Sequence, residues 1–212
     1  QWHGVDPLWS SPSCMRALPR AVVKATHRLH DWFTIRVKIM LPRLTLVLGG
    51  AASGKSAFAE NLLLQSDLAP VYIATGRVTD AEMGAKIKLH QIRRGPEWRL
   101  LEEPGSLSAP LADLGEKDGA LLDCATMWLS NRLMAQLPLD ASAEAVVDEL
   151  SHATAPVIVV SNEVGQGIVP ENKLARQFRE AQGRLNIAAA KHADLVVQVV
   201  AGLPNVLKGS LP

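Results

Sequence analysis

The chain has 212 residues, of which 48% are hydrophobic and 20% charged, and its formal net charge at pH 7 is +1. This composition is that of an ordinary globular protein with enough length for one α/β core. A near-zero net charge gives no general basic field, so we expect no nucleic-acid partner, and no apolar run is long enough for a membrane span. Cys14 and Cys124 are too few for a disulfide framework or a metal cluster, which predicts a reducing, cytoplasmic location.

The first forty residues differ from the remainder of the chain. They carry six Lys/Arg against two acidic residues and hold three of the five tryptophans, without a sustained helical or strand period. Met40 stands where an initiator would be expected, just before the first apolar run. We interpret residues 1–39 as a poorly ordered or untranslated extension of a domain spanning 40–212. A basic targeting or docking arm is the alternative.

Strand-like apolar runs alternate with helical stretches through the rest of the chain. Strands are predicted at 44–48, 70–75, 120–124, 157–161 and 195–201. Helices are predicted near 55–64, 80–93, 126–136, 142–152 and 171–192. Continuous apolar strands alternating with helices predict an α/β fold with a mostly parallel sheet and helices on both faces. Ligands of such sheets bind at the carboxyl ends of the strands.

A glycine-rich loop follows the first predicted strand directly. Gly49, four further residues and then Gly54-Lys55-Ser56 match the phosphate-binding pattern G-x-x-x-x-G-K-[ST], and a helical stretch follows. Glycines let successive N–H groups curl around phosphate oxygens, and the helix adds the positive end of its dipole. The pattern predicts that Lys55 binds the β- and γ-phosphates and that the Ser56 hydroxyl binds Mg²⁺. A glycine turn without a ligand is the alternative.

The third predicted strand ends in a carboxylate, Asp123. Apolar residues followed by an acid describe a Walker-B strand, whose acid reaches Mg²⁺ directly or through water. The same aspartate could instead cap the helix that follows it. Trp128, Leu129 and Leu133 have helical spacing in that helix and are predicted to be core residues.

Thr79 and Glu82 have the spacing of a capping box, which predicts the start of the second predicted helix. On this helix Met83, Ile87 and His90 share one face. A histidine on an apolar stripe is either a packed core residue or a catalyst, and the spacing alone leaves both open.

A loop with two glycines and a proline follows the fourth predicted strand and carries Glu163. Its composition fits a shaped binding loop or an ordinary turn. The basic residues of the long helix after it are read as a solvated face.

Five segments, in this order, resemble the adenosylcobinamide kinase/adenosylcobinamide-phosphate guanylyltransferase family of cobalamin biosynthesis. They are Gly49–Ser56, Tyr72–Thr75, Glu82–Trp98, Leu121–Cys124 and Asn162–Glu171. The resemblance covers about Leu44 to Lys208 and excludes the first forty residues. The last segment is the most specific, because generic P-loop proteins lack it.

This resemblance implies a P-loop NTPase-like fold, a homotrimer and two activities. Adenosylcobinamide would be phosphorylated with ATP or GTP, and GMP from GTP would then pass through a histidine to give adenosylcobinamide-GDP. The histidine corresponds to His90, and Mg²⁺ would be held by Ser56 and Asp123. Three positions depart from the family pattern: Leu89, Glu180 and Ile187.

The resemblance also implies the site residues. Lys55 and His90 are the predicted catalytic residues. The predicted nucleotide contacts are Gly49, Gly50, Ala51, Ala52, Ser53, Gly54, Lys55, Ser56, Ala74, Thr75, Gly76, His90, Gln91, Ile92, Arg93, Glu102 and Asp123.

Two other functions compete with this one. A different small-molecule P-loop kinase would make His90 structural. A GTP-dependent switch would need N-K-x-D to recognise guanine, and Asn172-Lys173-Leu174-Ala175 has alanine in place of the acid.

Overall fold

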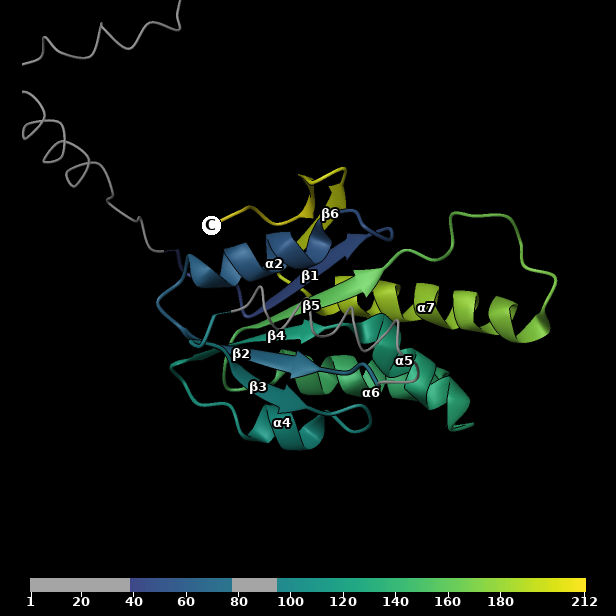
Figure 1. Ribbon diagram of the computed structural model, residues 1–212, viewed down its shortest axis with the longest axis horizontal. Coiled ribbons are helices and arrows are strands. Elements are labelled where there is room, and N and C mark those ends of the chain that lie inside the picture. Colours follow the sequence, from purple (N-terminus) through teal and green to yellow (C-terminus); the bar gives the residue numbers. More distant parts are fainter. Residues whose placement is uncertain (1–38, 78–94) are drawn as a thin grey trace, which may run out of the picture. The chain divides into compact units, whose positions relative to one another are not determined.

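The computed structural model describes residues 39–77 and 95–212 (Figure 1). Its strands are β1 (Leu44–Gly49), β2 (Ala69–Ala74), β3 (Arg99–Glu102), β4 (Asp118–Asp123), β5 (Val157–Asn162), β6 (Leu195–Val200) and β7 (Leu203–Lys208). Its helices are α2 (Lys55–Leu64), α4 (Ser108–Ala112), α5 (Ala125–Met134), α6 (Asp140–Ser151) and α7 (Lys173–His192). The predicted helix at 80–93 and its capping box lie outside the described residues.

The strands form one sheet in the order β3-β2-β4-β5-β1-β6-β7. The first six positions in this order are joined by parallel pairs, and only β7 runs antiparallel, to β6. β5 therefore lies between β1 and β4, the strands that end in the glycine loop and in Asp123. This arrangement confirms the predicted mostly parallel α/β fold.

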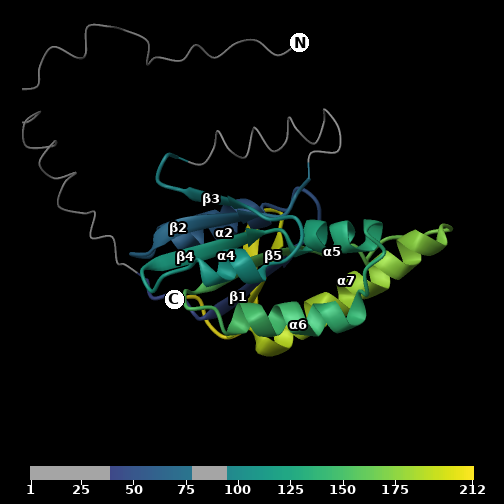
Figure 2. The ribbon, with the colours of Figure 1, turned by 90° about the horizontal axis from the view of Figure 1, so that it is seen from below.

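Both faces of the sheet are covered by helices, as predicted. Side chains of α2 pack on one face with alternate residues of the central strands, including Val47, Leu121 and Val160. Side chains of α4, α5, α6 and α7 pack on the other face with the intervening strand residues. Figure 2 shows α6 and α7 lying together along one side of the strands. Strands buried on both faces need apolar residues throughout, which explains their continuous apolar runs.

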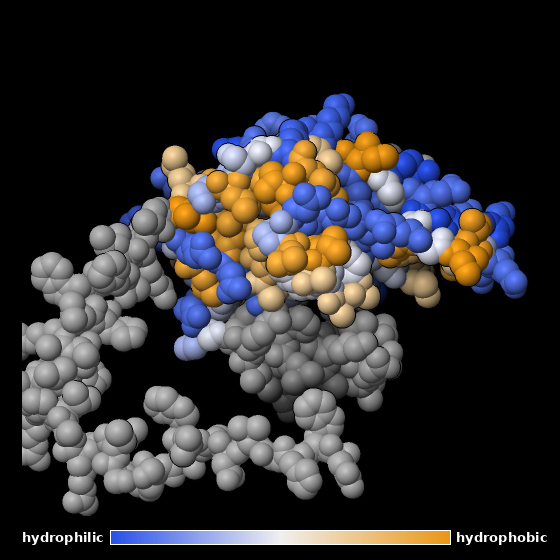
Figure 3. All heavy atoms as spheres, turned by 90° about the horizontal axis from the view of Figure 1, so that it is seen from above, coloured by the Kyte–Doolittle hydropathy of each residue, from blue (hydrophilic) through white to orange (hydrophobic). Residues whose placement is uncertain are grey.

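Three described elements were not predicted: the edge strands β3 and β7 and the short helix α4. Most of β3 and all of β7 are exposed, so neither carries the apolar run of a buried strand. Pro204 in β7 is a poor strand residue except at an edge. Figure 3 looks onto the side that carries α2 and β7, where apolar residues gather in patches bordered by polar ones. Edge strands are defined by their partners more than by their own sequence.

The predicted helix 55–64 agrees with α2 at both ends. Trp128 and Leu129 of α5 are buried, as expected for core residues, while Leu133 is half-buried. Among the helices of the described part of the chain, none combines the length and apolar character needed to cross a membrane.

Candidate nucleotide-binding site

The glycine loop joins β1 to α2 at the carboxyl edge of the sheet. β1 ends at Gly49 and α2 begins at Lys55, with Gly54 in the left-handed region at φ 93°. A Cβ on Gly49 would lie 2.7 Å from the carbonyl oxygen of Val199, so only glycine fits there. The two glycines of the pattern are therefore required by backbone conformation and by close approach of β6.

Hydrogen bonds hold the loop in this conformation. The N–H of Phe58 donates to the Gly54 oxygen at 2.9 Å, and the N–H of Gly202 donates to the Ser53 oxygen at 2.8 Å. The loop is therefore tied both to α2 and to the turn between β6 and β7. A preformed loop can offer its N–H groups to phosphate without first being ordered.

Lys55 lies over its own loop and is only 9% exposed. Its Nζ donates to the carbonyl oxygen of Gly50 at 3.1 Å. An ammonium group has three donors, so further protons remain for phosphate oxygens. Ser56, in the first turn of α2, is half-buried beside it.

Asp123 ends β4 at the same edge and is half-buried. In the sheet it pairs with Val160 of β5, and β5 is the strand next to β1. α5 begins with Cys124 as its N-cap residue and has no side-chain cap bond, which removes the helix-cap interpretation of Asp123. By strand alternation Asp123 follows Leu121 onto the face of the sheet that α2 covers.

The oxygen donors at this edge suit Mg²⁺, which takes one or two protein ligands together with substrate phosphates. Ser56 offers a hydroxyl and Asp123 a carboxylate. Within the described residues no group of three or more His, Cys, Asp or Glu side chains could hold a metal ion by itself. The donor set therefore fits a hard cation shared with a triphosphate, and not a dedicated protein cage.

Thr75, a predicted nucleotide contact, is fully buried directly after β2. Its hydroxyl donates to the Cys124 oxygen at 2.7 Å and accepts from the Cys124 N–H at 3.0 Å. The amide of Asn131 donates to the Thr75 oxygen at 2.7 Å. The Thr75 side chain thus joins the ends of β2 and β4, while Ala74 and Gly76 beside it are half-buried.

Glu102 ends β3, is exposed, and pairs in register with Ala74 of β2. Three strands separate β3 from β1, so Glu102 lies on the order of 19 Å along the edge from the loop, at about 4.8 Å per strand. A nucleotide that contacts both would have to lie along the carboxyl edge of the sheet.

His90, Gln91, Ile92 and Arg93 lie outside the described residues. The described residues before this segment end at Arg77, three residues beyond the carboxyl end of β2. After it, Trp98 packs edge-on against Tyr72 of β2, with ring centroids 6.2 Å apart.

Cys124, beside Asp123, is buried. Burial, followed by the neighbouring Asp123 charge, raises the pKa of its thiol to about 11. The thiol is therefore protonated at neutral pH and is unsuited to act as a nucleophile.

The loop after β5 contacts the glycine loop at its first residue, Glu163. Its N–H donates to the Gly49 oxygen at 3.1 Å, and its carboxylate accepts from the Gln198 amide at 3.0 and 3.1 Å. The Gln166 amide also donates to this carboxylate, at 3.1 Å. Among the predicted site residues Glu163 was absent, although the loop itself was recognised.

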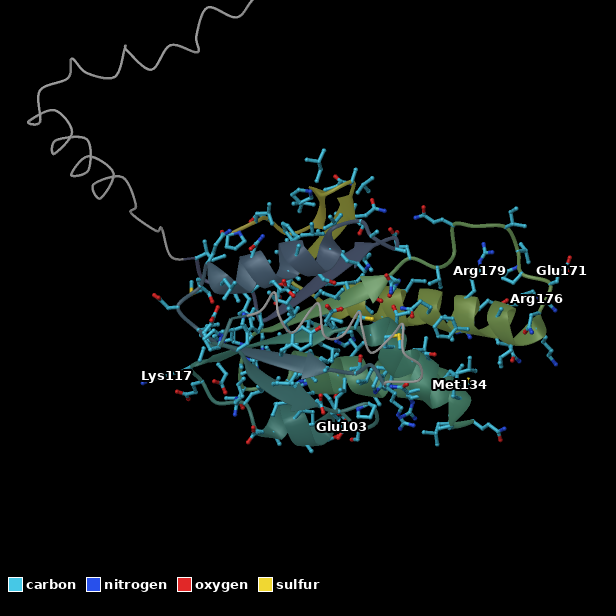
Figure 4. The ribbon with its side chains drawn as sticks, viewed as in Figure 1. Glu103, Lys117, Met134, Glu171, Arg176 and Arg179 are labelled. Atoms are coloured by element: carbon cyan, nitrogen blue, oxygen red, sulfur yellow. The ribbon has the colours of Figure 1, made fainter. Side chains whose placement is uncertain are left out.

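Two arginines of α7 hold the rest of this loop (Figure 4). Arg176 donates to the oxygens of Pro170, at 2.9 Å, and Glu171, at 2.5 Å, and Arg179 donates to those of Ile168, at 3.2 Å, and Gly165. The composition of the helix had indicated a solvated face. The structure shows that two of its charges instead satisfy loop carbonyls.

A phosphate loop between a buried strand and a helix, with an acid two strands away at the same edge, defines a P-loop nucleotide-binding protein. Residues 45–207 match the family described as cobinamide kinase / cobinamide phosphate guanyltransferase, from within β1 to within β7. The chain belongs to this family.

Curated relatives agree with this assignment. The chain is 46% identical over 167 residues to the bifunctional adenosylcobalamin biosynthesis protein CobP of Pseudomonas aeruginosa, covering 77% of this chain and 96% of that protein. It is 40% identical over 176 residues to the bifunctional adenosylcobalamin biosynthesis protein CobU of Salmonella typhimurium, covering 76% and 97%. Among solved structures, the flagellar accessory protein FlaH of Methanocaldococcus jannaschii has a TM-score of 0.48 at 15% identity, covering 81% of this chain and 84% of that one.

The prediction of the family, with its kinase and guanylyltransferase activities in cobalamin biosynthesis, is thereby confirmed. The guanylyl-histidine, the individual site residues, the bound metal and the trimer stay predictions.

Proposed function

We propose that this chain phosphorylates adenosylcobinamide with ATP or GTP and then converts the product to adenosylcobinamide-GDP through a guanylyl-histidine. The observation that carries the proposal is the buried Lys55 in a preformed phosphate loop, two strands from Asp123 at the same edge of the sheet, in a chain of this family. We place both reactions in the cytoplasm and in a homotrimer.

In the kinase step the substrate hydroxyl attacks the γ-phosphorus, and the bond to the bridging oxygen of the nucleoside diphosphate breaks. The hydroxyl proton leaves to water. Lys55 and the N–H groups of residues 50–56 stabilise charge on the phosphoryl oxygens. Mg²⁺ bound by Ser56 and Asp123 would neutralise further charge on the phosphates.

In the guanylyl step neutral His90 attacks the α-phosphorus of GTP, and pyrophosphate leaves. The phosphate of adenosylcobinamide phosphate then attacks the same phosphorus, forms the diphosphate bond and releases His90. A phosphate monoester is a poor nucleophile, and a covalent histidine intermediate divides the difficult displacement into two steps.

Labelling with α-³²P-GTP tests this proposal. The wild-type protein should take up label that is released by acid and stable to base, as expected of a phosphoramidate. His90→Ala should lose the label and guanylyl transfer but keep kinase turnover, because Lys55, Ser56 and Asp123 remain.

His192→Ala is the matched control, since His192 is an exposed residue in the last turn of α7. It should label like the wild type. Label that persists in His90→Ala would place the nucleophile elsewhere. Loss of both activities together with a lowered melting temperature would favour a packed histidine.

A further inference from the structure

Asn162 is the last residue of β5, the strand between the two that carry the phosphate loop and Asp123. It pairs directly with Gly49, the first residue of the phosphate loop. Asp123 of β4 pairs with Val160 of β5. Asn162 therefore lies two residues beyond Asp123 in the direction of the carboxyl edge of the sheet. Its side chain is therefore placed between the loop and the acid.

The alternation of β5 side chains determines which face Asn162 takes. Ile158 and Val160 pack on the face covered by α2, whereas Val159 packs on the opposite face. Ser161 also belongs to that opposite face, because its hydroxyl donates to Asn186 of α7 at 2.6 Å. Asn162 thus follows Val160 onto the face where α2 begins and where Lys55 and Ser56 lie.

The backbone of Asn162 is anchored on both sides by side chains of other elements. Its N–H is 2.9 Å from the hydroxyl oxygen of Thr126, a buried residue of α5. Its carbonyl oxygen accepts from the Asn186 amide at 3.2 Å, and Asn186 is itself bonded to the buried Gln182. These bonds fix the backbone at the end of β5 and hence the face of the sheet from which the Asn162 side chain projects.

Asn162 is half-buried, and within residues 39–77 and 95–212 its side-chain amide has no hydrogen-bond partner. The next residue differs sharply, because the Glu163 carboxylate is already taken up by Gln198 and Gln166. An amide with both donor protons unused, carried by an anchored backbone, is suited to bind a ligand at the site it faces.

We propose that the Asn162 side chain is a further catalytic residue of the kinase site, whose Nδ2–H group donates to the γ-phosphoryl group of the bound triphosphate. The inference rests on the proposed kinase function and adds a contact to it. An amide donor binds the γ-phosphate without the repulsion that a carboxylate would bring. The contact would also distinguish a triphosphate from a diphosphate, since a diphosphate has no γ-phosphoryl group for the amide to bind.

The test compares the affinities of two nucleotides, each with Mg²⁺, for Asn162→Ala and Asn162→Asp. β,γ-Imido-ATP carries a γ-phosphate and ADP does not. Asn162→Ala should bind the triphosphate analogue about tenfold more weakly, the loss of one hydrogen bond to a charged group, and bind ADP within about twofold of wild type. Asn162→Asp should weaken the analogue further, and kinase kcat should fall about 10²-fold in both variants.

Asn172→Asp is the control, because it makes the same chemical change at the far end of the loop that follows β5. Asn172 caps α7 by accepting from Leu174 and Ala175, which aspartate does equally well, so this variant should retain wild-type affinities. Equal weakening of ADP and the analogue, or unchanged affinity for both, would overturn the role of Asn162. Lys55→Ala, measured in parallel, distinguishes a failure of the Asn162 contact from a failure of the proposed kinase site. If Lys55→Ala leaves both affinities intact, the phosphate-loop assignment itself is wrong.

Discussion

At the scale of single residues, Lys55 combines burial with a bond to its own loop, which prepares its charge for phosphate before any ligand arrives. Lys55→Ala should reduce kinase kcat by about 10²–10³-fold, because the transition-state charge loses its nearest preorganised cation. Steady-state kinase assays measure this loss. Lys173→Ala, at the exposed start of α7, removes the same group away from the site and should leave turnover unchanged. Turnover of Lys55→Ala within tenfold of wild type would contradict the site.

Thr75 gives a prediction about stability. Thr75→Val keeps the shape of the side chain but leaves the buried N–H and carbonyl of Cys124 without the hydroxyl that each contacts. The free energy of unfolding should drop by about 1–3 kcal/mol, measured by urea denaturation. Thr75→Ser keeps the hydroxyl and should recover most of this loss. Equal destabilisation by both substitutions would mean that the methyl group matters and the hydrogen bonds do not.

At the scale of elements, the loop at 163–172 is held by α7 through arginine side chains and only weakly by its own contacts. Residues 164–169 are exposed, and Arg179 donates to two of their carbonyls. Arg179→Ala should therefore speed limited proteolysis within 164–169 several-fold, while global unfolding changes little, because opening is local.

Arg184→Ala is the control for this prediction, since Arg184 lies on an exposed part of the same helix and forms an ion pair with Glu180 one turn away. Its cleavage pattern, read by mass spectrometry, should match that of wild type. A similar acceleration in both variants would indicate that α7 itself frays.

At the scale of the whole molecule, a chain that begins at Met40 should fold and retain both activities. The described core starts with Leu41, which is buried, and no strand of the described sheet begins before Leu44. Among the described residues, the truncation removes the backbone bond from the Ile39 N–H to the Gln65 oxygen at 3.3 Å and the packing of Ile39 against the α2 side of the core.

Light scattering coupled to size exclusion, with assays of both activities, checks this expectation against the full chain. The shorter chain should have the same oligomeric state and a melting temperature within a few degrees. An insoluble product or a changed mass would show that residues 1–39 contribute to the structure.

Much of this protein could be predicted from local patterns alone. The phosphate loop, the Asp123 strand and the buried strands were recognisable because glycine spacing and apolar runs act over a few residues. Helix α2 was predicted at both ends for the same reason: the loop that precedes it sets its start. The family could be predicted from five sequence segments that occur in the same order along the chain, and the match over residues 45–207 confirms it.

Only the tertiary structure decided which strand ends meet. The order of strands places β5 between β1 and β4, which brings Asn162 beside Gly49 although 113 positions separate them in the sequence. The tertiary structure also brings the Thr75 hydroxyl into hydrogen bonds with the backbone of Cys124, and it brings Arg176 and Arg179 into hydrogen bonds with loop carbonyls. Such assignments depend on register and packing between distant segments. No local pattern of residue types contains that information, because any exposed arginine or buried threonine looks alike until its partner is placed.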